Sequence, residues 1–251
     1  MARLEQKTAV ITGASSGIGK GIALAYAREG AHVIVNYNRS REKSGQIVAE
    51  IMSAGGKAEA IQANTGQKDD IERLIGESQA ILGHIDIWVN NAGVDILTGP
   101  GAELDDQEKL QNLIDVDLKG TINCCWAVAP IMQSRGQGNI INMSWDLAIH
   151  GFAGRNPQMF AATKAGVLGF SRSLARTYGP EVRVNVLAPG WIETAFAENG
   201  MGEDYYQARI NEIPAGRFGT AEDVAEVAVF LASDDSSYIT GEMIKINGGL
   251  I

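Results

Sequence analysis

The feature that most constrains the fold is a glycine-rich segment that joins a short apolar run to a helical pattern near the N-terminus. The residues Thr12-Gly13-Ala14-Ser15-Ser16-Gly17-Ile18-Gly19 follow Ala9-Val10-Ile11 directly and open a helical stretch from Ile18 to Ala27. Glycines at this spacing allow a tight turn, a close approach of ligand to backbone, and close packing of helix on strand. The N–H groups and the dipole of the helix start then face an anion, which predicts a pyrophosphate cradle.

Length and charge favour a small-molecule partner. With 251 residues and 45% hydrophobic content, the chain can bury a substantial core, and we expect one domain over residues 1–251. A net charge of −9 disfavours binding to nucleic acid or to an anionic membrane, because both surfaces would repel an acidic protein. We find no segment resembling a signal peptide or a membrane span, so we expect a cytoplasmic protein. Cys124 and Cys125 are adjacent, which suits neither an ordinary disulfide nor a metal site, and we expect no metal.

Short β-branched runs alternate with longer helical patterns along the chain. Runs that are apolar on both faces and are separated by helices predict a parallel sheet covered on both sides. We therefore expect a doubly wound, Rossmann-like α/β fold of about seven strands, which binds ligands beyond the carboxyl ends of its strands. The predicted strands are Thr8–Thr12, His32–Tyr37, Ala58–Gln62, Ile85–Asn90, Asn139–Met143, Arg183–Ala188 and Met243–Asn247.

The segment 193–211 breaks this alternation. It is polar and aromatic, carries Gly200 and Gly202, and precedes a helix predicted from Ala221 to Ala232. Long loops in compact domains are usually functional or disordered. We expect a substrate lid here, with an ordinary surface excursion as the alternative.

Five motifs lie in order along essentially the whole chain. They are Thr12-Gly13-x-x-x-Gly17-x-Gly19, Asn90-Asn91-Ala92-Gly93, Lys164 on a long helix, Pro189-Gly190 with Thr194 beyond it, and Asn247-Gly248-Gly249. In this order and at this spacing, the chain resembles the short-chain dehydrogenase/reductase family. A lone glycine motif is weak evidence, whereas several motifs in a family's order are specific.

The resemblance implies a nicotinamide dinucleotide site. The glycine segment would hold the pyrophosphate, Asn91 and Gly93 would lie on the adenosine side, and Lys164 would bind the nicotinamide ribose. Ile192 and Thr194 would lie near the carboxamide. The alternatives are a plain strand-end turn for Asn91 and Gly93, and a solvated helix face for Lys164. The other cofactor residues expected on this basis are Gly13, Ser15, Ser16, Gly17, Ile18, Gly19, Ala92, Pro189 and Gly190.

The segment after the second predicted strand favours NADP over NAD. A carboxylate about 20 residues after the glycines would bind the ribose hydroxyls of NAD and repel an added phosphate, and this chain has none there. Instead, Asn36-Tyr37-Asn38-Arg39-Ser40-Arg41 offers neutral donors and cations. The alternative is an exposed helix start, although cations there oppose the helix dipole. Asn64 stands where the family usually has an aspartate near the adenine, which bears only on recognition of the base.

The reaction centre implied by the resemblance is altered. In the family, a tyrosine four residues before the lysine exchanges a proton with the substrate oxygen, a serine holds that oxygen, and an asparagine supports a water relay. Phe160 stands at the tyrosine position and has no ionisable proton. Asp117 replaces the asparagine, and Trp145 and Asp146 replace the serine. The candidate catalytic positions are Lys164, Asp146, Asp117, Phe160 and, if the alignment shifts by one residue, Ser144.

The altered centre is open to more than one explanation. A Tyr-to-Phe change engineered to trap a substrate needs one substitution, so several replacements favour natural divergence to altered chemistry. A catalytically silent protein that only binds the nucleotide would also tolerate these replacements. A lyase or isomerase that uses the aspartates on a bound substrate is a further explanation.

An active centre without the tyrosine needs another proton source. Asp146 and Asp117 are candidates because desolvation raises the pKa of a carboxyl group, although Lys164 would stabilise their ionised forms. The alternatives are strand-end capping for Asp146, and an ion pair with Lys164 or a bound water for Asp117. His150 is a further candidate, with an exposed loop position as the favoured alternative.

A carboxylate beside the nicotinamide would favour a cationic amine or iminium substrate, and an iminium accepts hydride without a proton on oxygen. We therefore predict an NADP-dependent oxidoreductase that acts on a small polar carbonyl, alcohol, imine or amine. The resemblance also implies a homotetramer or homodimer, with the helices that contain Lys164 packed between subunits. The residues expected to line the substrate pocket are Trp145, Asp146, His150, Trp191 and Phe196, with Phe152, Tyr205 and Tyr206 as further candidates.

Overall fold

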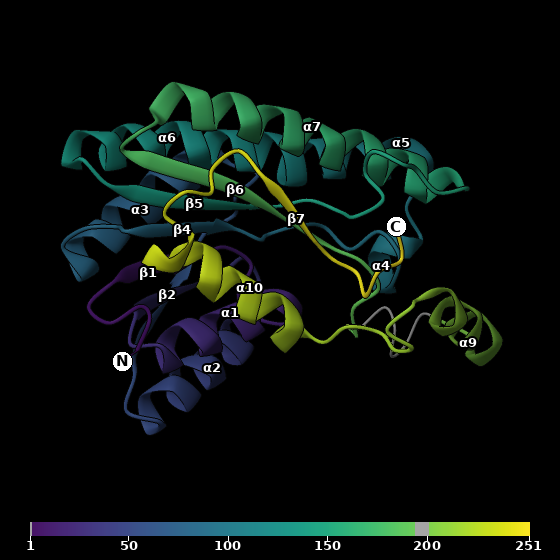
Figure 1. The fold of residues 1–251 in the computed structure, drawn as a ribbon, viewed down its shortest axis with the longest axis horizontal. Helices are drawn as coiled ribbons and strands as arrows, with labels where there is room; N and C mark the ends of the chain where they lie inside the picture. Colours follow the sequence, from purple (N-terminus) through teal and green to yellow (C-terminus); the bar gives the residue numbers. More distant parts are fainter. Residues whose placement is uncertain (1, 194–200) are drawn as a thin grey trace.

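A seven-stranded parallel sheet forms the centre of the protein (Figure 1). The computed structural model describes residues 2–193 and 201–251. The strands lie in the order β3-β2-β1-β4-β5-β6-β7 and each pairs in parallel with its neighbours, so the predicted doubly wound fold is confirmed. The strands are β1 (Thr8–Ile11), β2 (His32–Tyr37), β3 (Lys57–Gln62), β4 (Ile87–Asn90), β5 (Gly138–Met143), β6 (Val182–Pro189) and β7 (Met243–Ile246).

Every predicted strand is present, and only the bounds differ. The largest shift is at β4, which begins at Ile87 rather than at Ile85. β1 ends at Ile11, because Thr12 already belongs to the turn that leads into the first helix.

Helices cover both faces of the sheet (Figure 1). Helices α1, α2 and α10 lie on one face, and α3, α6 and α7 lie on the other. Successive side chains of a strand point to opposite faces, so Ala9 and Ile11 of β1 join one apolar cluster while Val10 joins the other. The bounds are α1 (Gly17–Arg28), α2 (Arg41–Ser53), α3 (Lys68–Leu82), α4 (Gly99–Ala102), α5 (Asp106–Asn112), the π-helix η1 (Leu113–Gly120), α6 (Thr121–Arg135), α7 (Arg155–Tyr178), α10 (Ala221–Ala232) and the 3-10 helix η2 (Asp234–Ser236).

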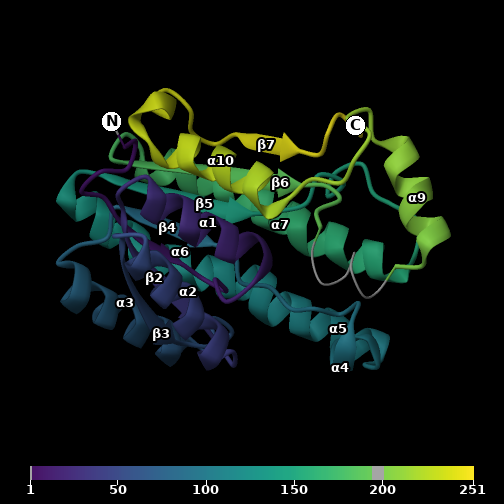
Figure 2. The same cartoon turned by 90° about the horizontal axis from the view of Figure 1, so that it is seen from below.

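The carboxyl ends of all strands meet at one edge of the sheet, and the loops that follow them gather there. Helix α9 (Glu203–Glu212) lies beyond this edge, at the end of the molecule away from the N-terminus (Figure 2). It belongs to the segment predicted as a lid, of which residues 194–200 lie outside the described ranges. Of the helices described, none combines the length and the apolar character needed to cross a bilayer.

Candidate functional site

The turn between β1 and α1 has the geometry of a phosphate cradle. Gly13 and Gly17 have positive φ angles of 62° and 53°, which disfavour residues with a Cβ. A Cβ on Gly13 would lie 2.7 Å from Cα of Ala92, whereas nothing lies within 4 Å of one on Gly17. Ser16 precedes α1 without a side-chain cap, and the first turn carries no acidic residue. The space above Gly17 and the uncapped N–H groups therefore fit a dinucleotide pyrophosphate.

Hydrogen bonds between Thr12 in this turn and the segment that follows the neighbouring strand β4 brace the turn. The hydroxyl of Thr12 accepts hydrogen bonds from the backbone N–H groups of Asn91 and Ala92, both at 3.0 Å. The amide of Asn91 donates to the carbonyls of Thr12 at 3.0 Å and Gly13 at 3.1 Å. The structure thus brings two of the predicted motifs together, and the side chain of Asn91 is a brace within the protein.

Asn36 extends the brace to the second and third strands. Its Oδ1 accepts from the N–H of Gly13 at 3.2 Å, and its Nδ2 donates to the carbonyls of Ile61 and Ala63, both at 3.2 Å. With 1% of its surface exposed, Asn36 contributes to the cradle's shape and cannot face a ligand.

Of the residues after Asn36, those just before α2 are open to a ligand. Asn38 and Arg39 are exposed and Ser40 is half-buried, whereas the predicted cofactor residue Tyr37 is buried. Within residues 2–193 and 201–251, neither Arg39 nor Arg41 forms an ion pair. Asn64 lies at the end of the next strand, where its Oδ1 accepts from the N–H of Gly66 at 3.0 Å.

Lys164 and Asp117 form a buried ion pair deep in the site. Nζ of Lys164 on α7 lies 2.8 Å from Oδ2 of Asp117 on the π-helix, and their side chains are 11% and 3% exposed. The other carboxylate oxygen accepts from the N–H of Val94 at 3.0 Å. Thr121 donates its hydroxyl to the carbonyl of Asp117 at 2.8 Å and so stabilises the irregular helix. Of the two alternatives for Asp117, the structure contains the ion pair.

The rings of Trp145 and Phe160, which the family resemblance aligned with a serine and a tyrosine, lie close together. The ring centroids of Trp145 and Phe160 lie 6.3 Å apart at an interplanar angle of 57°. Phe160 also packs against the small apolar cluster that includes Ile96 and Leu113. The hydroxyl of Ser144 is buried and donates to the carbonyl of Lys164 at 2.9 Å, which engages its proton within the protein.

Asp146 is fully buried and points toward β7. Its Oδ2 accepts from Nδ2 of Asn247 at 3.1 Å, and its Oδ1 accepts from the N–H of Leu147 at 2.9 Å. Desolvation raises the pKa of Asp146, while these hydrogen bonds act in the opposite direction. Because Lys164 neutralises Asp117, neither aspartate offers the free carboxylate that the sequence led us to expect. His150 is exposed in the loop after β5.

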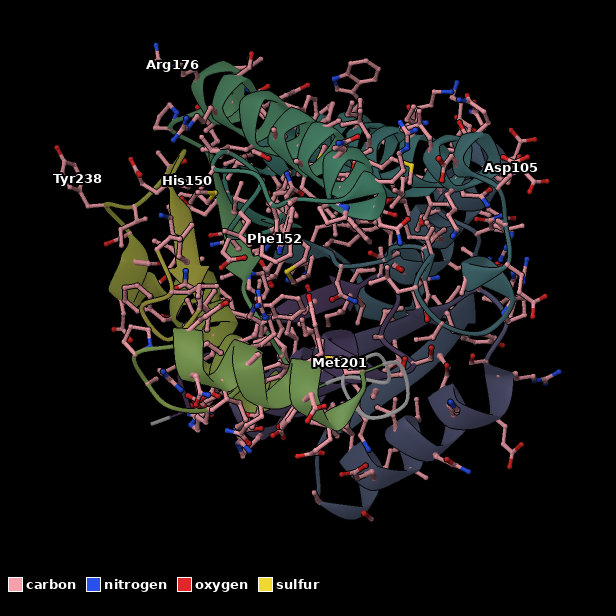
Figure 3. The ribbon with its side chains drawn as sticks, turned by 90° about the vertical axis from the view of Figure 1, so that its right-hand side faces the viewer. Asp105, His150, Phe152, Arg176, Met201 and Tyr238 are labelled. Atoms are coloured by element: carbon pink, nitrogen blue, oxygen red, sulfur yellow. The ribbon has the colours of Figure 1, made fainter. Side chains whose placement is uncertain are left out.

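Aromatic side chains join helix α9 to the loops at this edge. Trp191, just after β6, lies within 6.3 Å, centroid to centroid, of Phe152, Tyr205 and Phe218. Figure 3 shows Phe152 between the start of α7 and α9. The guanidinium of Arg209 lies over the rings of Phe152, at 5.6 Å, and Tyr205, at 5.0 Å. Arg209 was not among the residues predicted from the sequence, although its i, i+4 spacing from Tyr205 indicates that the two side chains are neighbours on one helix face. Ile192 is buried next to this group, whereas Thr194 and Phe196 lie outside the described residues.

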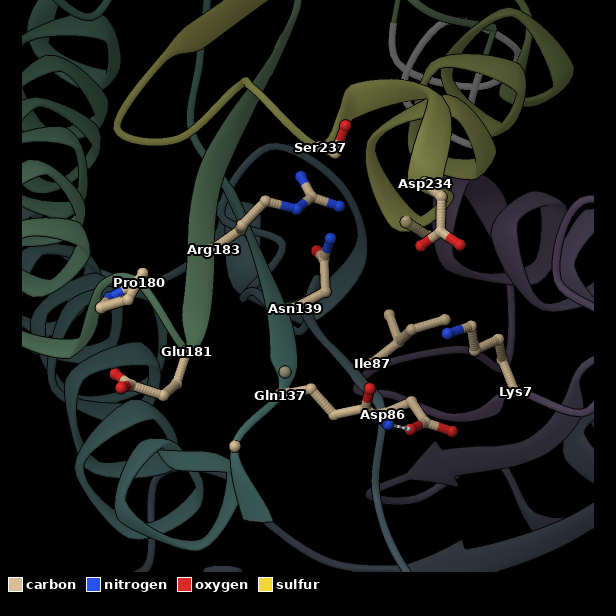
Figure 4. A pocket seen from close by; sticks show the side chains of 13 residues that line it. Lys7, Asp86, Ile87, Gln137, Asn139, Pro180, Glu181, Arg183, Asp234 and Ser237 are labelled. Atoms are coloured by element: carbon tan, nitrogen blue, oxygen red, sulfur yellow. Dashed lines mark hydrogen bonds between the residues drawn. The ribbon is translucent and has the colours of Figure 1, made fainter. Parts of the chain in front are cut away.

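A cavity of about 230 Å³ lies at the opposite, amino edge of the sheet (Figure 4). Asn139 and Arg183 line it, and both donate to the carbonyl of Leu231. Oδ1 of Asn139 is buried without a hydrogen-bond partner in the described parts of the chain. This cavity is separate from the glycine turn, because the two lie at opposite ends of the strands. Within the described ranges, we find no group of three or more His, Cys, Asp or Glu side chains that could hold a metal ion.

Comparison with known proteins gives consistent matches over the whole chain. The family model described as enoyl-(acyl carrier protein) reductase matches residues 13–251. The 3-oxoacyl-[acyl-carrier-protein] reductase FabG of Thermotoga maritima is 40% identical over 252 residues, covering 99% of each chain. FabG of Staphylococcus epidermidis is 39% identical over 250 residues, covering 97% of this chain and 98% of its own.

Solved structures agree with this result. A protein named as a short-chain alcohol dehydrogenase, from Sinorhizobium meliloti, superimposes with a TM-score of 0.88 at 34% identity, covering 98% of this chain and 97% of its own. A protein named as an NAD(P)-dependent gluconate 5-dehydrogenase, from Beutenbergia cavernae, contains NADP at low occupancy. It superimposes with a TM-score of 0.87 at 35% identity, with the same coverage.

Proposed function

Because the chain belongs to the short-chain dehydrogenase/reductase family, we propose that it is an NADP(H)-dependent oxidoreductase that transfers hydride without a tyrosine as proton donor. The observation that carries this proposal is an intact glycine turn together with an aromatic pair, in which Phe160 stands at the position of the proton donor and Trp145 at the position of the serine that holds the substrate oxygen. Neither ring carries a group that delivers a proton near neutral pH.

The coenzyme site uses the residues described above. The glycine turn and the uncapped start of α1 would hold the pyrophosphate, and Lys164 would hold the nicotinamide ribose through its ammonium group. Bound NADPH supplies a hydride, and bound NADP accepts one. The NADP-containing structure from Beutenbergia cavernae supports this coenzyme. The absence of a carboxylate after β2 and the exposure of Arg39 agree with it.

A carbon–nitrogen double bond is the substrate group that fits this centre best. A protonated imine already carries its proton, so hydride addition at carbon moves the π electrons to nitrogen and leaves a neutral amine. No protein acid is needed in this step. The relatives named as 3-oxoacyl reductases act on a ketone, whose oxygen must gain a proton when it is reduced.

The cationic substrate would be held by aromatic faces. The sequence favoured a cation because of expected free carboxylates, but Asp117 is paired with Lys164 and Asp146 is buried. Trp145 and Phe160 are half-buried and would offer ring faces instead, and a ring face attracts a cation by about 0.5–2 kcal/mol. The aromatic pair thus replaces the carboxylates as the reason to expect an iminium.

A matched pair of substrates tests the proposed function. With NADPH in excess, pyrroline, which is a cyclic imine, should be reduced at a rate well above that of cyclopentanone, as measured by the absorbance of NADPH. Faster reduction of the ketone would contradict the proposal. NADPH binding without reduction of any imine or ketone would favour the second candidate, a catalytically silent nucleotide-binding protein, which the Lys164–Asp117 pair also supports.

Arg39→Ala should weaken NADPH binding by about 10- to 100-fold and NADH binding by less than about 3-fold, because only NADPH carries the 2′-phosphate. Fluorescence titration of both coenzymes measures the two affinities. Arg41→Ala, at the first residue of α2, removes the other cation of this segment and shows whether the preference depends on Arg39 alone. Equal losses for the two coenzymes would contradict a phosphate contact at Arg39.

We also propose that the protein is a homodimer or homotetramer that associates through α6 and α7. Trp126 on α6 is 60% exposed and packs edge-on against Phe170 of α7, with ring centroids 6.2 Å apart. An exposed tryptophan packed against a half-buried phenylalanine, on two long helices, is typical of an interface between subunits. Its position on α7 agrees with the arrangement that the family resemblance implies.

A further inference from the structure

Asp146 connects three strand ends beside the Pro189–Gly190 turn, through its backbone N–H and its carboxylate. Asp146 follows β5, and its N–H donates to the carbonyl of Pro189 at the end of β6, at 3.2 Å. Its Oδ2 accepts from Nδ2 of Asn247, which follows β7, at 3.1 Å. The N–H of Gly190 donates to the carbonyl of Ile246 at 2.9 Å and closes the group.

The backbone of the turn at Gly190 is in close contact with Asp146 and Asn247. A Cβ added to Gly190 would lie 2.7 Å from Cβ of Asn247 and 3.0 Å from Oδ2 of Asp146. Contacts this short leave no room for a side chain, so the backbone of the turn is held at the distance that Asp146 and Asn247 set. A change in the pair therefore moves the turn.

The donor and the acceptor of the hydrogen bond between Asn247 and Asp146 are fixed by their other contacts. Asn247 has only one orientation available, because its Oδ1 accepts from the N–H of Gly249 at 3.2 Å while its Nδ2 donates to Asp146. Both oxygens of Asp146 are accepting hydrogen bonds, and 0% of its surface is exposed. A carboxylate in this setting cannot touch a substrate.

We propose that Asp146 is a positioning residue. Its buried hydrogen bond with Asn247, here called the latch, holds the Pro189–Gly190 turn in place and thereby shapes the nicotinamide half of the coenzyme site. This inference rests on the proposed binding of NADP(H), because the turn matters to the coenzyme only if it lies beside the nicotinamide. It gives Asp146 a role without proton transfer.

An exchange of the two side chains tests the latch. In Asp146→Asn, the oxygen of the new amide can keep the hydrogen bond from the N–H of Leu147. Its nitrogen then lies opposite Nδ2 of Asn247, so two donors face each other. In Asn247→Asp, two carboxylates face each other. The double variant Asp146→Asn, Asn247→Asp restores one donor and one acceptor, and its new carboxylate can still accept from the N–H of Gly249.

The affinities of two ligands report separately on the nicotinamide half and on the adenosine half of the coenzyme site. We expect each single variant to bind NADPH about tenfold more weakly, and to bind 2′-phospho-ADP-ribose, which lacks the nicotinamide, with unchanged affinity. The double variant should recover NADPH affinity to within about threefold of the original chain. Fluorescence titration gives the first affinity, and calorimetry gives both.

Any other pattern of affinities contradicts the proposed role of Asp146. Full NADPH affinity in Asp146→Asn shows that the bond positions nothing, and a double variant that stays weak shows that the pairing is not the cause. An equal loss for both ligands, with a lowered melting temperature, shows general damage to the fold. If the unaltered chain binds neither ligand, the proposed function itself has failed, which is distinct from a failure confined to the variants.

Discussion

Phe160→Tyr alone is expected to raise cyclopentanone reduction by less than about tenfold, whereas the triple variant Trp145→Ser, Phe160→Tyr, Asp117→Asn should raise it by about 10²- to 10⁴-fold. The phenol supplies the missing proton, but in the single variant Trp145 still fills the serine position and Lys164 is still paired with Asp117. Asparagine at position 117 keeps an oxygen for the N–H of Val94 and releases the ammonium group of Lys164. The rate of ketone-dependent NADPH oxidation measures the gain.

The single variants show which substitution causes the gain in ketone reduction. Trp145→Ser on its own should leave ketone reduction unchanged, because a serine without the phenol holds the oxygen but protonates nothing. A full gain from Phe160→Tyr alone would mean that one substitution had silenced an ordinary ketone reductase, which is the outcome expected of an engineered trap. No gain in the triple variant would mean that the site is shaped for different chemistry beyond these three side chains.

Lys164→Met should lower the free energy of unfolding by about 3–5 kcal/mol, because it leaves the carboxylate of Asp117 buried without a counter-charge. Urea denaturation followed by circular dichroism measures this loss. The additional change Asp117→Leu should recover most of it, since replacing both members of a buried ion pair by apolar groups is often neutral.

The chain offers a matched control for this variant. Lys119 and Asp115 form an ion pair at the same distance of 2.8 Å, but their side chains are 58% and 41% exposed. Lys119→Met should therefore cost less than about 1 kcal/mol. Similar losses for the two methionine variants would show that burial does not set the energy of the Lys164–Asp117 pair.

The sequence predicted the strands, their parallel direction and the glycine turn because these features are local or follow general rules. An apolar run of four to eight residues between helical patterns identifies a strand without knowledge of its partners. The glycines of the first turn likewise have a conformational requirement that is visible in the sequence. The proposed contacts of the cradle with the coenzyme remain predictions.

The direction of the polar side chains could not be predicted. Asp146 accepts from Asn247, 101 residues further along the chain, and only the pairing of β6 with β7 makes this bond possible. Asn36 looked like a ligand-facing donor, but it is buried and holds three strand ends. The choice between an ion pair and a proton relay at Asp117 likewise depended on an irregular helix, which sequence periodicity does not reveal.

The brace between Thr12 and Asn91 has a consequence for synthesis on the ribosome. The hydroxyl of Thr12 binds partners that are translated 79 and 80 residues later. A nascent chain that has exposed only β1 to β3 therefore contains all the glycines of the cradle but lacks the strand that holds them in place. Coenzyme added during translation would find its first binding-competent chains only after β4 has emerged and paired with β1.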